Sequence, residues 1–99
     1  MIARMWHGCV PASKKDEYLE YLNRTGIPDY KNTKGNLGVN IYCRTTGDDA
    51  HFLLISYWVS YDVIRDFAGD DIQKARYYPE DKKFLKEFEP EVIHYERIQ

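Results

Sequence analysis

Several patterns that usually carry chemistry are missing from this sequence. It has no glycine-rich phosphate loop, no nucleophile elbow and no dinucleotide fingerprint. Cysteine is scarce, because only Cys9 and Cys43 are present, far apart and outside any CxxC pair. The three histidines, His7, His51 and His94, lack the spacing of metal ligands. The sequence therefore predicts no metal site and no cofactor.

Charge of one sign and long apolar runs are also lacking. The formal net charge is −2, and charges of both signs are spread along the chain, so no basic block indicates a nucleic-acid partner. No apolar stretch approaches the length of a membrane span, and Met1 leads directly into a strand-like run without a signal peptide. With the unpaired cysteines, these features predict a reduced, cytoplasmic protein with no membrane partner.

Aromatic residues are abundant for so short a chain. The 99 residues fit one domain, 1–99, whose core is limited by its size. Aromatics nevertheless make up 15% of the residues, and nine of them are Tyr. We therefore expect some of these rings to line a pocket or a subunit interface.

The chain is organised around one stretch, residues 51–69, HFLLISYWVSYDVIRDFAG. Its first half is apolar, aromatic and branched, which predicts a strand buried on both faces. Ser60 or Asp62 can cap a following helix, and Gly69 stands where that helix should end. Trp58 lies at the junction of the strand and the helix.

The other expected elements are placed by turn residues and periodicity. Gly26 and Pro28 predict the end of a first helix. Pro79 fits the first turn of a late helix. The elements expected outside 51–69 are a strand at 2–10, a helix from 13 to about 25, a long connection at 27–38, a strand at 39–44, a hairpin loop at 45–50, short helices at 72–77 and from 79, and a strand at 91–98. The order is βαββαβ, an α+β ferredoxin-like arrangement with an antiparallel sheet.

The predicted strands are apolar on both faces. Leu53, Ile55 and Tyr57 point to one side of the central strand, while Phe52 and Leu54 point to the other. Helices can cover only one face, so the sequence predicts a homodimer in which a second copy covers the other. The alternative is a monomer with an unusually apolar surface.

Motifs along nearly the whole chain resemble the antibiotic biosynthesis monooxygenase family of dimeric α+β barrels. These motifs are the strand and helix of residues 2–22, Lys34-Gly35-Asn36-Leu37-Gly38-Val39, Ser56-Tyr57-Trp58-Val59-Ser60, Phe67-Ala68-Gly69-Asp70-Asp71-Ile72, Tyr78-Pro79-Glu80-Asp81 and residues 88–95. The resemblance implies a ligand in a cleft between sheet and helices. It also implies cofactor-free oxygenation of aromatic molecules or, in another branch, haem degradation. That branch uses an Asn, a Trp and a His, and ungapped placement puts Met5, Phe67 and Tyr77 there. None matches, so we expect no haem degradation.

Two histidines and one arginine are candidates for the chemistry. Arg4 and His7 interrupt an apolar strand, so they either reach a ligand or form internal hydrogen bonds. His94 lies within the last expected strand and could act as a general base toward a phenolic substrate, or hold a structural hydrogen bond. We therefore predict His7 and His94 as catalytic residues and Arg4 as a substrate-binding residue.

Aromatic side chains complete the predicted site. An aromatic-lined pocket would use five of them, although rings at such positions also build cores. The predicted substrate-binding aromatics are Trp6, Trp58, Phe67, Tyr77 and Tyr78.

The first functional hypothesis is a cofactor-independent, oxygenase-like protein acting on a small aromatic or enolisable substrate. A His or Tyr would remove a proton, and the carbanion would react with oxygen. The alternatives are a non-catalytic dimeric module that binds a small hydrophobic ligand, and a dimer whose interface is its only role.

Overall fold

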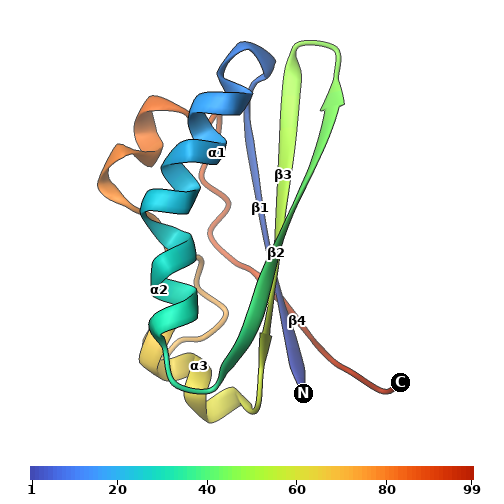
Figure 1. Cartoon of the computed structure of the whole chain (residues 1–99), viewed down its shortest axis with the longest axis vertical. Coiled ribbons are helices and arrows are strands. Elements are labelled where there is room, and N and C mark those ends of the chain that lie inside the picture. The colour runs from blue at the N-terminus through green and yellow to red at the C-terminus, as the bar shows by residue number, and fades with distance from the viewer.

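Four antiparallel strands form one sheet in the order β2-β3-β1-β4 (Figure 1). The computed structural model describes residues 1–99. The elements are β1 (Ile2–Pro11), η1 (Ala12–Lys14), α1 (Lys15–Arg24), α2 (Gly26–Asn32), β2 (Asn36–Thr46), β3 (Asp49–Trp58), α3 (Tyr61–Ala68), η2 (Pro79–Lys83) and β4 (Ile93–Glu96). This arrangement confirms the predicted α+β ferredoxin-like fold with an antiparallel sheet. No helix combines the length and the apolar character needed to cross a membrane.

The two faces of the sheet have different surroundings. Burial alternates along β1 and β3, as expected for strands with one covered face. Figure 1 shows the helices and the segment after α3 on one side of the sheet, and no element against the other. We call these the covered face and the open face. Trp6, Phe52 and Trp58 lie on the covered face, and Met5, Leu53 and Ile55 lie on the open face.

The connection predicted at 27–38 is wrong, because Gly26–Asn32 form α2. Gly26 and Pro28 mark a break between two helices, and the chain turns at Thr25. The Thr25 hydroxyl donates to the Tyr21 carbonyl at 2.8 Å and thereby satisfies the end of α1. Pro28 is tolerated because it lies in the first turn of α2, where backbone N–H groups have no partner within the helix.

The helix predicted at 72–77 is also wrong. Its carbonyls are used by other parts of the chain, because Arg4 donates to Ile72 and Lys74, and the Val92 amide donates to Gln73. These partners replace the hydrogen bonds of a helix. The segment turns at Ile72 and Gln73 and then runs beside residues 90–92, with an antiparallel bridge between Lys74 and Glu91.

The remaining boundaries differ by a few residues. The predicted helix from Pro79 shortens to η2, where the Asp81 carboxylate accepts the Tyr78 amide at 2.7 Å. The expected strands at 39–44 and 51–58 extend toward each other around Gly47, whose positive φ of 58° suits the tight turn. The last strand is shorter than predicted, with four residues instead of eight.

Candidate functional site

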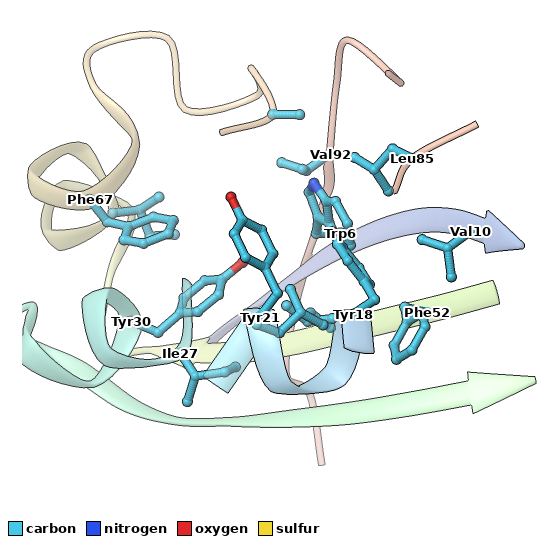
Figure 2. Packing of buried hydrophobic residues seen from close by; sticks show 14 of the residues in the cluster. Trp6, Val10, Tyr18, Tyr21, Ile27, Tyr30, Phe52, Phe67, Leu85 and Val92 are labelled. Atoms are coloured by element: carbon cyan, nitrogen blue, oxygen red, sulfur yellow. The ribbon is translucent and has the colours of Figure 1, made fainter. Parts of the chain in front are cut away.

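The cleft between the sheet and the helices is almost filled by aromatic side chains (Figure 2). Tyr30 stacks on Phe67 with ring centroids 4.4 Å apart, and Trp58 packs on Phe67 at 5.5 Å. The remaining cavity is about 20 Å³, which is room for about one water molecule. It is lined by Trp6, Tyr18, Leu22, Gly26, Tyr30, Leu54, Phe67, Arg76, Tyr78 and Asp81.

A buried carboxylate borders this cavity. Asp81 is only 3% exposed, and its Oδ1 accepts a hydrogen bond from the Tyr18 hydroxyl at 2.9 Å. Burial raises the pKa of Asp81, although the Tyr78 amide and the Tyr18 hydroxyl oppose this effect by stabilising the carboxylate. The pKa of Tyr18 is raised by burial and by the nearby negative charge of Asp81. Asp81 is therefore the better proton acceptor of the two.

A second carboxylate, Asp29 on α2, contacts two residues that line the cavity. Asp29 Oδ2 accepts a hydrogen bond from the Tyr78 hydroxyl at 2.7 Å and pairs with Arg76 Nη2 at 3.0 Å. Arg76 also donates to the Phe67 carbonyl at 2.8 Å and lies over the Phe67 ring at 4.8 Å. These contacts hold the segment after α3 against α2.

Arg4 and His94 form a pair on the covered face, next to the cavity. Arg4 is 1% exposed, and its Nη1 donates to His94 Nε2 at 3.0 Å and to the Ile72 carbonyl at 2.5 Å. Burial, and secondarily the positive charge of Arg4, lower the pKa of His94 to about 4. His94 is therefore neutral at pH 7, with its proton on Nδ1. Arg4 holds internal hydrogen bonds, which was one of the two predicted roles.

His7 lies on the open face, away from the cavity. Its Nδ1 contacts Glu89 Oε2, and its Nε2 is 3.1 Å from His51 Nδ1. The imidazole rings of His7 and His51 stack with centroids 5.3 Å apart. The structure therefore separates the two predicted catalytic histidines onto opposite faces, and their catalytic roles stay predictions.

The predicted aromatic residues divide into cavity walls and core. Trp6, Phe67 and Tyr78 border the cavity. Trp58 does not border the cavity. It is fully buried in the core, and its indole N–H donates to Ser56 Oγ at 2.9 Å. Tyr77 packs on Phe88 at 4.8 Å, and its hydroxyl donates to the Glu89 carbonyl.

Tyr18, Tyr30, Arg76 and Asp81 border the cavity without having been predicted. Tyr18 belongs to the apolar side of the first helix. Its hydroxyl is the one feature in the sequence that could have identified it as a cavity residue. Tyr30 and Arg76 lie where the predicted local structure is wrong. Asp81 caps the first turn of η2, where its carboxylate accepts the Tyr78 amide, and a capping residue gives no sign of a cavity in the sequence.

The fold belongs to a broad class, the ferredoxin-like α+β proteins, and in this chain one face of the sheet is open. More specifically, the chain has the antibiotic biosynthesis monooxygenase-like fold, as the resemblance predicted. It superimposes on a candidate antibiotic biosynthesis monooxygenase from Nitrosomonas europaea with a TM-score of 0.70 and 14% identity, covering 100% of both chains.

Two haem-binding structures also match. The haem degrader MhuD from Mycobacterium tuberculosis, with two haems in its active site, gives a TM-score of 0.66 at 15% identity, covering 100% of this chain and 97% of MhuD. A single-residue variant of MhuD, with two manganese protoporphyrin IX molecules per active site, gives a TM-score of 0.64 at 17% identity. The match covers 100% of this chain and 96% of the variant. No family model and no curated protein matches the sequence. These likenesses establish the fold.

The structure shows which way Met5 faces, the residue that ungapped placement puts at the Asn of the haem-degrading branch. Met5 lies on the open face, because it alternates with Arg4 and Trp6, which face the helices. Met5 therefore faces away from the cleft, and the cleft-facing residues beside it are Arg4 and Trp6. Neither is the Asn of that branch, and Phe67 and Tyr77 differ from its Trp and His.

Proposed function

We propose that the protein is oxygenase-like and binds a small aromatic or enolisable molecule in the cleft, without a cofactor there. The observation that carries the proposal is the buried Asp81 carboxylate in a cavity walled by aromatic rings. An apolar pocket with a few convergent polar groups and a perturbed pKa is the usual form of a small-molecule site.

Binding requires the cleft to open, because 20 Å³ does not admit an aromatic ring. The segment after α3 supplies one wall through Arg76, Tyr78 and Asp81. Its tie to α2 depends on two side-chain contacts with Asp29, both of which are partly exposed. We propose that this wall moves away from α2 when a ligand enters.

The proposed chemistry is proton removal followed by reaction with oxygen. Asp81 takes a proton from the substrate, and the resulting carbanion adds to O₂ with formation of a carbon–oxygen bond. The peroxide then takes the proton back, so that substrate and O₂ together give a hydroperoxide. Asp81 suits the first step better than His94, because Asp81 borders the cavity and His94 does not.

The second candidate function is non-catalytic binding of the same class of ligand. One observation favours it: both Asp81 oxygens already accept hydrogen bonds, Oδ1 from Tyr18 and Oδ2 from the Tyr78 amide. A substrate must displace one of these donors before Asp81 can act as a base.

Binding and oxygen uptake separate the two candidates. Quinols and polyphenols would be titrated while tryptophan fluorescence is followed, and oxygen consumption would be measured on the ligands that bind. Phe67→Ala should tighten binding by enlarging the cavity, whereas Phe88→Ala, at a 47% exposed position, serves as the control.

Oxygen uptake that is lost in Asp81→Asn, with binding retained, supports the oxygenase. Binding without uptake in the parent protein selects the binding module. Absence of binding in both the parent and Phe67→Ala would refute both.

We also propose that a second copy of the chain covers the open face. Large apolar side chains remain exposed there, among them Tyr42 at 52%, Ile93 at 58% and Tyr95 at 54%. Leu53, Ile55 and Met5 lie between them on the inner strands. A contiguous apolar sheet face is typical of an interface, and a two-fold axis pairs this face with itself.

Light scattering at micromolar concentration should give about twice the chain mass. Ile55→Lys should shift the protein to a monomer, because it places a charge at the centre of the proposed interface. Leu19→Lys changes a residue of α1 that is 38% exposed on the other side of the molecule, and should leave the dimer intact. A monomeric parent protein would exclude the proposal.

A further inference from the structure

The open face carries a second cluster of reactive side chains, near the β2–β3 hairpin. Cys9 on β1 and His51 on β3 are cross-strand partners, and Pro11 pairs with Asp49 in the same register. Strand pairing therefore places the thiol, the imidazole and the carboxylate on one face. Cys9 Sγ, a carboxylate oxygen of Asp49 and a ring nitrogen of His51 all lie within 4.8 Å of one another.

We infer that Cys9, Asp49 and His51 form a binding site for a divalent first-row transition metal, of which Zn²⁺ is the best match. A thiolate, an imidazole and a carboxylate are the three ligand types that zinc takes in proteins. Zinc–ligand bonds of about 2.0–2.3 Å place tetrahedral ligands about 3.3–3.7 Å apart. Ligand atoms that lie within 4.8 Å of one another therefore need a contraction of about 1.5 Å at most.

His7 and Glu89 position the metal-binding imidazole. If His7 donates from Nδ1 to Glu89, its Nε2 is free to accept a hydrogen bond from His51 Nδ1 at 3.1 Å. That assignment satisfies both contacts and leaves the lone pair of His51 on Nε2, the nitrogen we assign to the metal. A histidine ligand commonly donates its other N–H to such a partner, which fixes its tautomer and ring orientation.

Three protein ligands leave the fourth tetrahedral position of zinc unfilled by this copy of the chain. On the same face, a hollow of about 360 Å³ adjoins His51 and is lined by His7, Tyr42, Cys43, Arg44, His51 and Leu53. Three protein ligands with one open position resemble the arrangement of zinc sites that bind water or a small anion. Arg44 is the cross-strand partner of His51, and its positive charge favours an anion in that position.

The expectation of no metal site rested on spacing along the chain. The three ligands are separated by 40 and by two positions in sequence, and the register of β1 with β3 brings them together. The site lies on the face opposite the aromatic cavity, so it does not depend on the function proposed for the cleft.

The ammonium group of Lys86 opposes the metal and provides a test. Lys86 Nζ pairs with Asp49 Oδ1, so a cation already neutralises this carboxylate. Removing that ammonium group should leave Asp49 free for the metal. We expect Lys86→Gln to bind Zn²⁺ several-fold more tightly than the parent protein. If the cluster were only a structural ion pair beside stacked imidazoles, Lys86→Gln would leave zinc binding unchanged.

The experiment is a competitive Zn²⁺ titration of the full chain after chelator treatment, with a parallel Co²⁺ titration followed by absorption. We expect one Zn²⁺ per chain and a thiolate-to-cobalt charge-transfer band. Cys9→Ser should abolish that band, and Cys9→Ser and His51→Gln should each weaken Zn²⁺ binding at least tenfold. Cys43→Ser is the matched control, because Cys43 is a free thiol that borders the same hollow but is not one of the three proposed ligands.

Thermal melting of each variant would show that it is folded before its affinity is compared. The inference is overturned if the parent binds no stoichiometric Zn²⁺ at micromolar concentration. It is also overturned if Cys9→Ser and His51→Gln bind like the parent, or if Cys43→Ser weakens binding as much as they do.

Discussion

Replacement of Arg4 by Met tests how the segment after α3 is held to the sheet. The guanidinium donates to the Ile72 and Lys74 carbonyls and to His94 Nε2. Met keeps much of the apolar stem but leaves these acceptors without donors, at about 1–3 kcal/mol for each buried group. Part of that loss is offset, because the substitution also removes a buried positive charge and the Nε of Arg4, which has no hydrogen-bond partner. We expect a net destabilisation of about 2–4 kcal/mol in urea unfolding.

The same substitution should change how stability depends on pH. His94 has a pKa of about 4 in the folded protein, below its ordinary value of 6.5. Between these values the unfolded chain binds more protons at His94, so stability falls as the pH drops through that window. Since His94 is partly exposed, we discount this contribution to about 1–2 kcal/mol between pH 7 and pH 4. Without the positive charge of Arg4, the pKa of His94 should rise and the slope should decrease.

Urea unfolding at several pH values and an NMR titration of the His94 imidazole check both effects. Arg97→Met is the control, because Arg97 is exposed and its side chain contacts only the Met1 sulfur at 3.8 Å. It should change stability by less than about 0.5 kcal/mol. An Arg4→Met protein as stable as the parent, with an unchanged pKa at His94, would refute the role assigned to Arg4.

Three further predictions follow from the packing. Trp58→Ala should cost about 3–5 kcal/mol in thermal or urea unfolding, because the ring is fully buried; a variant that melts like the parent would contradict the core assignment. Cys9 and Cys43 lie on strands separated by β3, about 9–10 Å apart across the sheet, beyond the reach of a disulfide. Thiol titration of denatured protein, purified without reductant, should therefore find two thiols per chain. Haem should not be degraded, because the Tyr77 hydroxyl is bonded to the Glu89 carbonyl and burial raises its pKa to about 12. Enzyme-dependent, catalase-insensitive loss of the Soret band after reductant is added in air would overturn this prediction.

The strands were predictable because their signals are local. Alternation of apolar residues, and turn residues such as Gly47, define β1, β2 and β3 without knowledge of the rest of the chain. The predictions for 27–38 and 72–77 were wrong for different reasons. Gly26 and Pro28 mark a break between two helices and not the end of one, whereas distant residues determine the path of 72–77. In the second of these, Arg4 takes the Ile72 and Lys74 carbonyls from a position about 70 residues earlier.

The candidate site was also predictable only in part, because some of its features are local and others depend on packing. Trp6, Phe67 and Tyr78 were identified from residue type and resemblance, and they do border the cavity. The small size of the cavity could not be predicted, because it depends on how the rings of α1, α2 and α3 pack together. The Cys9, Asp49 and His51 cluster could not be predicted either, since it depends on the register of two strands joined by some 37 intervening residues.

The central position of β1 has a consequence for how the chain folds during synthesis. This strand is synthesised well before its partners β3 and β4, which begin at residues 49 and 93. Until residue 58 has emerged, the apolar β1 has no strand to pair with, whereas β2 and β3 can close their own hairpin locally. The nascent chain therefore exposes an unpaired apolar strand for longer than its size indicates, and early chaperone contact with residues 2–11 is the expected protection.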